Sequence, residues 1–192
     1  MTSTNTNTDT SWATAYVSSK VEAFNAHVLS QGLSYTPSIV LDVRDINSMV
    51  TLAIVAEIKK VIPDLISDII AVRFSADNAS ANAFGIAKFC DDLNIPCTCL
   101  DISEEVDREA EIISNVIRAA SIMKKLHRDM SRGVLYYIAN RKKGMVMTSI
   151  NKSDLHIGNF SKTSDRVGDW NLIGDLTNVQ VLELAKYFNI CS

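Results

Sequence analysis

Two arginines stand where predicted strands end, a position from which a cation can hold an anion. Arg44 follows the first predicted strand, and Arg73 leaves the second. Ligands of open α/β sheets bind beyond the carboxyl ends of the strands, so both side chains are candidates for contacting a nucleotide. Each also has a simpler interpretation, because an arginine at such a place often serves as an ion-pair partner, and Arg44 has Asp42 and Asp45 beside it.

The histidines and cysteines indicate neither a metal site nor a nucleophile. No two of His27, His127 and His156 have the spacing of metal ligands, and no serine or cysteine near them suggests a catalytic pair. Cys97 and Cys99 flank one residue of a predicted strand, which places both side chains on one face. One intervening residue is not the usual zinc spacing, so the sequence favours buried, reduced thiols.

Glycine is scarce where a phosphate-binding turn would need it. The chain has 7 glycines among 192 residues, and none lies between positions 33 and 84. Phosphate-binding turns commonly use glycine because a Cβ atom obstructs the approach of phosphate to backbone amides. Any such turn in this part of the chain must therefore work without glycine.

Hydrophobic periodicity predicts helices that alternate with strands. The expected strands are 38–43, 68–74, 97–102 and 145–149, and the expected helices are 12–31, 48–61, a segment ending near 93, 103–140 and 179–188. The candidate caps are Asp45 or Asn47 for the second helix and Asp77, Asn78 or Ser80 for the third. We expect a break near 131–133 and irregular structure over 150–175. This order predicts an α/β fold with a doubly wound parallel sheet, whose strands are apolar because both faces are covered.

Length and charge narrow the class of protein. The formal net charge is −3 and 47% of the residues are hydrophobic, which suits one domain without the basic footprint of a nucleic-acid-binding protein. No apolar run approaches the ~20 residues of a membrane span. Residues 1–11 lack the parts of a signal peptide and are predicted to be a disordered arm before a single domain over 12–192. A cytoplasmic protein that binds neither nucleic acid nor membrane is expected.

The segments after the fourth predicted strand form a recognisable pattern. They read T-S-I-N-K-S-D at 148–154, G-N-F-S-K-T-S-D at 158–165 and I-G-D-L-T-N-V-Q-V at 173–181. This pattern resembles the ammonia-dependent NAD synthetase family, whose comparable runs are G-T-x-N-K-S-E, G-Y-F-T-K-Y-G-D and I-G-D-L-x-K-x-Q-V. Residues 70–73 extend the likeness, which covers most of the chain from about Ser38.

The resemblance implies a Rossmann-like, three-layer α/β/α fold of the adenine nucleotide α-hydrolase type, and a homodimer. Members of that family use ATP to activate the carboxylate of deamido-NAD, and ammonia then displaces AMP. The reaction needs backbone amides for the departing pyrophosphate, a Mg²⁺ ion and cations. ATP and Mg²⁺ are therefore the expected cofactors if activity remains. The family continues beyond the helix that matches 179–188, which implies a shortened member.

Candidate site residues follow from the strand ends and from the resemblance. The nucleotide-binding candidates are Arg44, Ser48, Val72, Arg73, Thr148, Lys162 and Asp165, and the metal candidates are Asn47 and Asp154. Lys162 and Asp165 match the family outright, whereas Asp154 replaces a glutamate and Asn47 an aspartate. Simpler interpretations stay open, because Asp154 can belong to a helix cap, Lys162 can be a solvated side chain and Asp165 can shape a turn.

The likeness fails where the chemistry depends on it most. The family's phosphate loop, S-G-G-x-D-S, aligns with residues 43–48, where only Ser48 matches and both glycines are replaced. Asp45 adds a negative charge that would face the triphosphate, and Asn178 replaces a later lysine. The helical arginine pair of the family falls on Asp129 and Ser131, although Arg128 and Arg132 lie nearby.

Three functions are compatible with this pattern. The favoured one is a pseudoenzyme that keeps the fold and the dimer and acts by binding an adenine nucleotide or a protein partner. The second is a working ammonia-dependent synthetase with an altered phosphate loop. The third is a pure interaction protein, a regulator or inhibitor, with an occluded cleft. The first is preferred because each lost contact of this kind can be worth orders of magnitude in rate.

Overall fold

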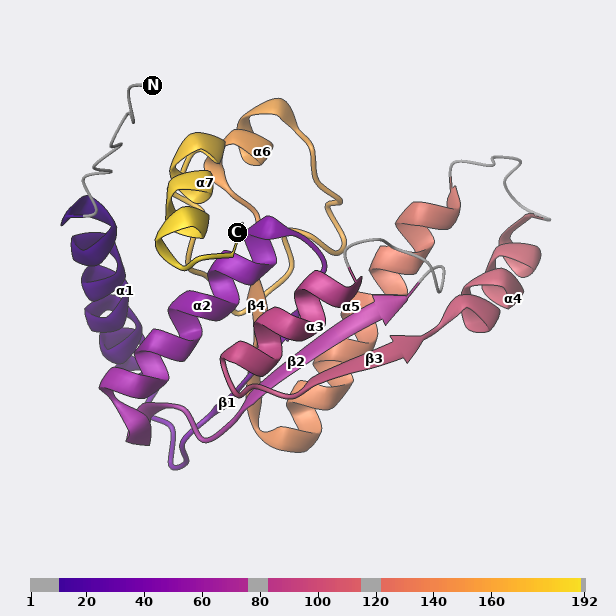
Figure 1. Ribbon diagram of the computed structural model, residues 1–192. Coiled ribbons are helices and arrows are strands. Elements are labelled where there is room, and N and C mark those ends of the chain that lie inside the picture. The colour runs from indigo at the N-terminus through magenta and orange to yellow at the C-terminus, as the bar shows by residue number, and fades with distance from the viewer. Residues whose placement is uncertain (1–10, 76–82, 115–121, 191–192) are drawn as a thin grey trace, which may run out of the picture.

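A five-stranded, wholly parallel sheet forms the centre of the molecule (Figure 1). The computed structural model describes residues 11–75, 83–114 and 122–190. The strands are β1 (Ser38–Asp42), β2 (Ile69–Ser75), β3 (Cys97–Asp101), β4 (Gly144–Thr148) and β5 (Trp170–Asn171). Their order across the sheet is β3-β2-β1-β4-β5.

Helices cover both faces of the sheet. They are α1 (Ser11–Ser30), α2 (Ile46–Val61), α3 (Ala83–Asp92), α4 (Ser103–Ser114), α5 (Ile122–Lys142), α6 (Lys152–Ile157) and α7 (Asn178–Tyr187), with a 3-10 turn, η1, at Pro63–Leu65. Side chains of α1, α2, α3 and α7 share the larger apolar core with one face of the sheet. Helix α5 packs its side chains on the other face, and α4 packs on α5. The predicted doubly wound, three-layer α/β/α fold is confirmed.

The order of the strands in the sheet changes direction at β1. Strands β2 and β3 follow β1 toward one edge of the sheet, and β4 then lies on the other side of β1. Strand β1 pairs with β2 on one side and with β4 on the other, and the connection through α4 and α5 carries the chain across. The carboxyl ends of β1 and β4 therefore lie side by side, at residues 43–48 and 149–151. In open α/β sheets this switch point is where ligands bind.

Most predicted elements are confirmed, with five corrections. The helix predicted over 103–140 is two helices, α4 and α5, which pack on each other. Helix α5 runs without a break through 131–133, and Ser11 already belongs to α1 instead of to the N-terminal arm. The stretch 150–175 contains a helix, α6, and a strand, β5, that were not predicted. Both faces of every strand were predicted to be covered, but strand β3 lies at the edge of the sheet and its residues are half-exposed or exposed. The proposed caps of the third helix, and residues 1–10 of the arm, lie outside the described residues.

The expectation of buried thiols holds only in part. Cys90 is buried, Cys97 is partly buried and Cys99 is exposed, so the prediction is wrong for Cys99. The reason is the edge position of β3, because no strand or helix of the described residues covers the Cys99 side chain. Cys191 lies outside the described residues.

Helix α1 contacts the segment 170–175 through hydrogen bonds and an ion pair. The hydroxyl of Tyr16 donates to the carbonyl of Leu172 (2.8 Å) and to Asp175 Oδ1 (2.7 Å), and Lys20 pairs with the same carboxylate at 3.0 Å. Burial, followed by the hydrogen bond to Asp175, raises the pKa of Tyr16 well above its usual range. The aspartate of the I-G-D-L motif thus anchors a helix.

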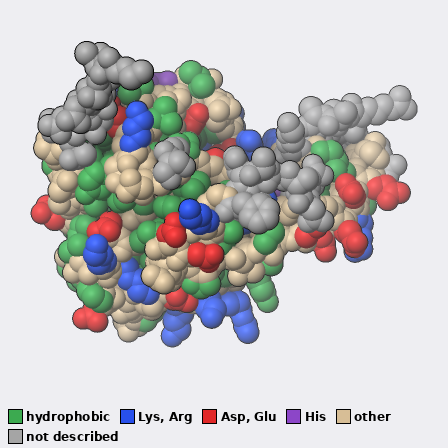
Figure 2. Space-filling view, viewed as in Figure 1, with side chains coloured by type: hydrophobic (Ala, Val, Ile, Leu, Met, Phe, Trp, Pro, Cys, Tyr) green, Lys and Arg blue, Asp and Glu red, His purple; other side chains and the backbone are tan. Residues whose placement is uncertain are grey.

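The surface of the molecule carries mixed charge. Figure 2 shows Lys and Arg side chains interspersed with Asp and Glu over α2 and α3, and acidic side chains gathered over α4. Among the described residues, none of the helices combines the length and the apolar character that a membrane crossing requires.

Phe24 tests the attachment of α1. Its ring is fully buried and lies 5.1 Å from the Trp170 ring, centroid to centroid. We expect Phe24→Ala to lower the free energy of unfolding by about 3–5 kcal/mol, because a large core side chain is lost. Leu29→Ala on the same helix is the matched control, since Leu29 is 70% exposed. Urea denaturation measures both, and equal effects would contradict the packing described here.

Candidate functional site

The turn after β1 closes on itself without glycine. Asp45 is the N-cap of α2: its Oδ1 accepts the backbone N–H of Ser48 at 2.9 Å. The Ser48 hydroxyl oxygen in return accepts the backbone N–H groups of Arg44 and Asp45, both at 2.9 Å. This is a capping box, in which side chains of the turn satisfy amides that a helix start leaves unpaired.

The backbone of this turn also avoids the conformations that favour glycine. Among the described residues, the non-glycine positions with positive φ are Asn94, Lys143 and Asn189, none of which lies in the turn. The glycine gap noted in the sequence is therefore compatible with an unstrained turn. What the missing glycines change is the space beside the amides, where the Asp45 side chain now accepts the backbone N–H of Ser48.

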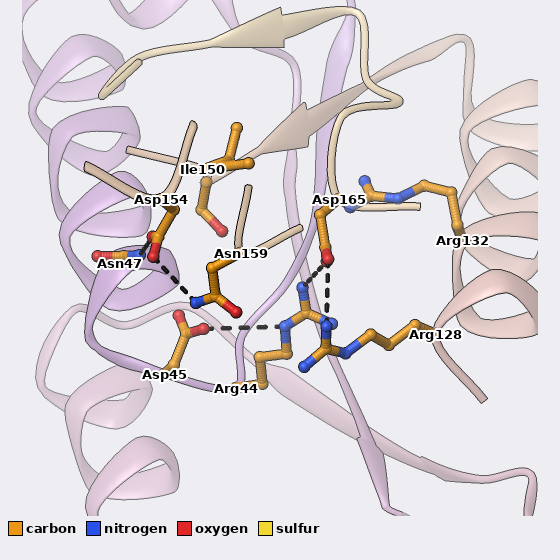
Figure 3. Close-up of a pocket in the computed structure, with 10 residues that line it drawn as sticks. Arg44, Asp45, Asn47, Arg128, Arg132, Ile150, Asp154, Asn159 and Asp165 are labelled. Atoms are coloured by element: carbon orange, nitrogen blue, oxygen red, sulfur yellow. Dashed lines mark hydrogen bonds and ion pairs between the residues drawn. The ribbon is translucent and has the colours of Figure 1, made fainter. Parts of the chain in front are cut away.

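Arg44 extends from this turn across the switch point and meets several carboxylates (Figure 3). Its Nη2 lies 2.6 Å from Asp165 Oδ1, its Nη1 lies 3.5 Å from Asp42 Oδ2 and its Nε lies 3.9 Å from Asp45 Oδ2. The sequence left two possibilities for Arg44, an anion ligand or a partner of Asp42 and Asp45. The structure confirms the ion pairs and adds Asp165, which is 121 positions away in the chain.

Asp165 is the acceptor on which the opposite loop converges. Its Oδ2 accepts the backbone N–H of Ser161 at 2.7 Å and faces Arg128 Nη1 at 3.3 Å. Its main-chain carbonyl accepts the hydroxyl of Thr148 at 2.6 Å. Burial by itself raises the pKa of Asp165, but the Ser161 amide and the Arg44 guanidinium outweigh it, so the pKa lies below its usual range.

Helix α5 supplies two arginines to the cavity, although the arginine pair of the family pattern aligns with Asp129 and Ser131. Arg128 and Arg132, one helical turn apart, both line the cavity, and Arg132 is 7% exposed and donates to the carbonyl of Met147 at 3.2 Å. Burial lowers the pKa of Arg132. The two aligned residues make other contacts. The Asp129 carboxylate accepts the hydroxyls of Ser161 and Thr163, and the Ser131 hydroxyl donates to the carbonyl of His127 in the same helix. The i, i+4 spacing of the two arginines was the available signal.

Beneath the arginines, Asp42 ends β1 in a nearly buried position. Its Oδ1 is buried without a hydrogen-bond partner, while Oδ2 faces Arg44. Burial raises the pKa of Asp42, and the nearby Arg44 and Arg132 guanidinium groups oppose that rise. The sequence indicated only a local pairing role for Asp42, because its burial depends on helix α5, which packs against β1.

The two metal candidates form a network of side-chain amides with their neighbours. Asn47 Nδ2 donates to Asp154 Oδ2 at 3.1 Å, and Asn159 Nδ2 donates to Asp154 Oδ1 at 3.1 Å. Asn47 Oδ1 accepts from Asn151 Nδ2 at 3.2 Å, and the same nitrogen donates to Asn178 Oδ1 at 2.6 Å. The only carboxylate of this group thus has both oxygens engaged by amide donors. Mg²⁺ is usually bound through one or two carboxylates, so Asp154 with neutral amides around it is a weaker donor set for Mg²⁺ than the aspartate and glutamate of the family pattern.

A small cavity opens between these groups. It has a volume of about 170 Å³ and is lined by Arg44, Asp45, Asn47, Arg128, Arg132, Ser149, Ile150, Asp154, Asn159 and Asp165. Three arginines and three aspartates stand in this lining, so their formal charges cancel. Pockets for drug-sized ligands are usually ~300–1,000 Å³. The cavity is therefore smaller than the usual pocket for a drug-sized ligand, and the charges of its cations are balanced by carboxylates of the same lining.

The predicted site residues divide into three groups. Arg44, Asn47, Asp154 and Asp165 come together around the cavity. Ser48, Val72 and Thr148 are buried outside the lining: Ser48 and Thr148 make hydrogen bonds, and Val72 packs in the smaller apolar core. Arg73 lies on β2 without lining the cavity, and Lys162 has an exposed side chain on the loop. Sequence reasoning missed Asn159 as a lining residue, since a lone asparagine in a loop carries no distinctive signal.

A parallel sheet in this order, with a charged cavity at its switch point, defines a Rossmann-like α/β fold of the adenine nucleotide α-hydrolase type. The family model for NAD synthase matches residues 51–192, and the chain belongs to that family. The matched region begins just beyond the turn at 43–48, the segment whose chemistry differs most from the family pattern.

Solved structures share the fold. The NH3-dependent NAD synthetase from Campylobacter jejuni superposes with a TM-score of 0.79 at 20% identity, covering 93% of this chain and 74% of that one. The NMN synthetase from Francisella tularensis gives a TM-score of 0.81 at 17% identity, covering 92% and 71%. At these identities the likeness concerns the fold.

Curated relatives match over shorter segments. The NH(3)-dependent NAD(+) synthetase of Methanococcus aeolicus is 39% identical over 57 residues, which is 30% of this chain and 22% of the relative. That of Syntrophomonas wolfei is 28% identical over 102 residues, which is 50% of this chain and 41% of the relative. The alignments thus span less than half the length of these relatives.

Asp165→Asn tests the ion pairs that fill the site. We expect the variant to lower the free energy of unfolding at pH 7 by about 1–3 kcal/mol, because charge-assisted hydrogen bonds are lost in a poorly solvated place. The Asp165 pKa is lowered in the folded chain, so its stabilisation is complete above the unfolded pKa of about 3.9 and is lost as the pH falls through the folded value. The difference from wild type should therefore shrink below about pH 4.

The control is Glu57→Gln, which removes an exposed pair with Lys60 on α2. Its effect should stay below about 1 kcal/mol. Urea titrations between neutral and acidic pH measure both variants. An Asp165→Asn effect no larger than that of Glu57→Gln would contradict a structural role for the pair.

Proposed function

We propose that this chain is a catalytically degenerate member of the NAD synthase family, which keeps the fold and acts by binding instead of by ATP-driven ligation. The observation that carries the proposal is the turn at 43–48. The Asp45 carboxylate occupies the start of α2, where the resemblance implies contacts to the phosphates of ATP. A nucleotide would have to displace this carboxylate and would meet its negative charge.

The cations that the reaction needs are also engaged elsewhere. Arg44 is paired with Asp165, and Arg132 is buried against the main chain of β4. Lys162, which matches the family, has an exposed side chain outside the cavity, and Asn178 stands where the family has a second lysine. With no net positive charge in the lining, little remains to stabilise the charge that develops during transfer to ammonia.

The binding role is either toward an adenine nucleotide or toward a protein partner. A cavity of about 170 Å³ with cancelled charges favours the protein partner, as in an interaction protein with an occluded cleft. The alternative of a working synthetase draws support from Asp154 and Asp165, which keep carboxylates at family positions in the cavity. The homodimer implied by the family resemblance and the cytoplasmic location expected from the sequence stay predictions.

A synthetase assay separates the degenerate protein from the working enzyme. We expect no NAD above background from deamido-NAD, ATP, magnesium and ammonia at high protein concentration. The NH(3)-dependent NAD(+) synthetase of Methanococcus aeolicus serves as the positive control. A parallel assay with the nicotinate mononucleotide looks for NMN, the product named for the Francisella tularensis neighbour. Time-dependent formation of either product would overturn the proposal.

Restoring the family turn tests whether the filled site is what excludes ATP. We expect ATP with magnesium to leave the melting temperature of the wild-type chain unchanged at millimolar concentration. The triple variant Arg44→Gly, Asp45→Gly and Asn47→Asp should gain about 1.4 kcal/mol when ATP is tenfold above its Kd. For a domain of this size that is a rise of about 3–5 °C.

Lys162→Ala is the matched control for this experiment, since its side chain is exposed and outside the cavity, and it should behave as the wild type. Each variant is melted without ligand first, so that altered stability is separated from binding. If ATP raises the melting temperature of the wild-type chain, the cleft is not occluded and binds a nucleotide.

A further inference from the structure

A second cavity lies outside the switch point, formed by residues of α1, β4, α6 and the segment 166–171. It has a volume of about 420 Å³, and its lining includes His27, Ile150, Leu155, Arg166, Asp169 and Trp170. Ile150 also lines the cavity at the switch point, and no other residue of this lining does. The volume falls in the range of ~300–1,000 Å³ that is usual for pockets that bind small molecules.

Two rings in this lining are fixed against one another. The His27 ring meets the Trp170 ring nearly at a right angle, with 4.1 Å between the centroids and 70° between the planes. The fully buried ring of Phe24 lies 5.1 Å from the same indole. Trp170 is thus held by the core while part of its surface stays exposed. A fixed indole of this kind offers a flat apolar surface on which another ring can pack.

Arg166 and His27 bring polar groups to the same lining. The Arg166 guanidinium lies over the Phe160 ring, 5.1 Å from its centroid, which restricts its orientation. Among the residues that the structure describes, no carboxylate forms an ion pair with Arg166, and no group forms a hydrogen bond with the His27 ring. A guanidinium donates two parallel hydrogen bonds to a carboxylate, so Arg166 is suited to hold one.

The charge of the lining favours a ligand with a single negative charge. Asp169 stands in the lining beside Arg166, and its Oδ2 accepts the backbone N–H of Val146 at 2.7 Å. With His27 neutral, the formal charges of Arg166 and Asp169 cancel. A second negative charge on the ligand would therefore meet Asp169 without a further cation to offset it, which favours a carboxylate over a dianionic phosphate.

We infer that this cavity binds a small aromatic carboxylate. The ring of the ligand packs on the Trp170 indole, its carboxylate pairs with the Arg166 guanidinium, and the His27 ring donates a further hydrogen bond. Ile150 and Leu155 supply apolar contacts. The site shares no charged residue with the cavity at the switch point, so it is independent of whether ligation is lost there.

The experiment titrates the full, isotope-labelled chain with benzoate and follows the indole N–H signal of Trp170 by NMR. The chain has two tryptophans, so the Trp12→Phe variant assigns the signal. We expect benzoate to shift this signal and to saturate it at millimolar concentration. Benzamide keeps the ring without the charge, and it should bind at least about tenfold more weakly, because the charge-assisted pair is lost. Phenyl phosphate should also bind more weakly than benzoate.

Arg166→Gln should weaken the binding of benzoate at least about tenfold for the same reason. Lys152→Gln is the matched control, since Lys152 is an exposed cation of α6 outside the lining, and its affinity should equal that of the wild type. The spectrum of each variant without ligand verifies its fold. An unmoved Trp170 signal, equal affinity for benzamide, tighter binding of phenyl phosphate, or an Arg166→Gln variant that binds as the wild type would each overturn the inference.

Discussion

The ion pair between Arg44 and Asp165, with 2.6 Å between Nη2 and Oδ1, joins the two loops that meet at the switch point of the sheet. Asp165 also accepts the Ser161 amide with its carboxylate and the Thr148 hydroxyl with its main-chain carbonyl, so one residue ties the loop after β4 to the turn after β1. The Asp165 side chain is only 10% exposed whereas that of Arg44 is 33% exposed, so removing Arg44 would leave a poorly solvated carboxylate. The arrangement of the cavity follows from this pair.

The loss of the glycines and the gain of Asp45 are physically a single change. The amides at a helix start need an acceptor, which either a bound anion or a side chain can supply. Where a side chain supplies the acceptor, the amides of the helix N-terminus are hydrogen-bonded without a ligand. Glycine, which leaves the backbone open to a bound anion, is then not needed. Asp45 and Ser48 supply that acceptor here, and the macrodipole of α2 further favours the carboxylate.

The sequence predicted the elements whose residues carry their own signal. Strands β1, β2 and β4 are apolar runs, and the polar motifs after β4 led to Asp154 and Asp165. Strand β5 is only two residues long, too short for any periodicity, and it exists because β4 offers it a pairing edge. Arg44 and Asp165 are 121 positions apart in the chain. Local sequence patterns therefore identified each residue as a candidate but could not predict that the two form an ion pair.

Strand β3 forms one border of the sheet and leaves its outer row of backbone amides and carbonyls without a neighbouring strand among the described residues. Such a border is a template on which another chain can align and start an aggregate. Two features discourage this: the strand has only five residues, and it ends at Asp101, whose carboxylate is tied to Ser103 at the start of α4. The solubility of the folded chain therefore depends in part on how short this strand is.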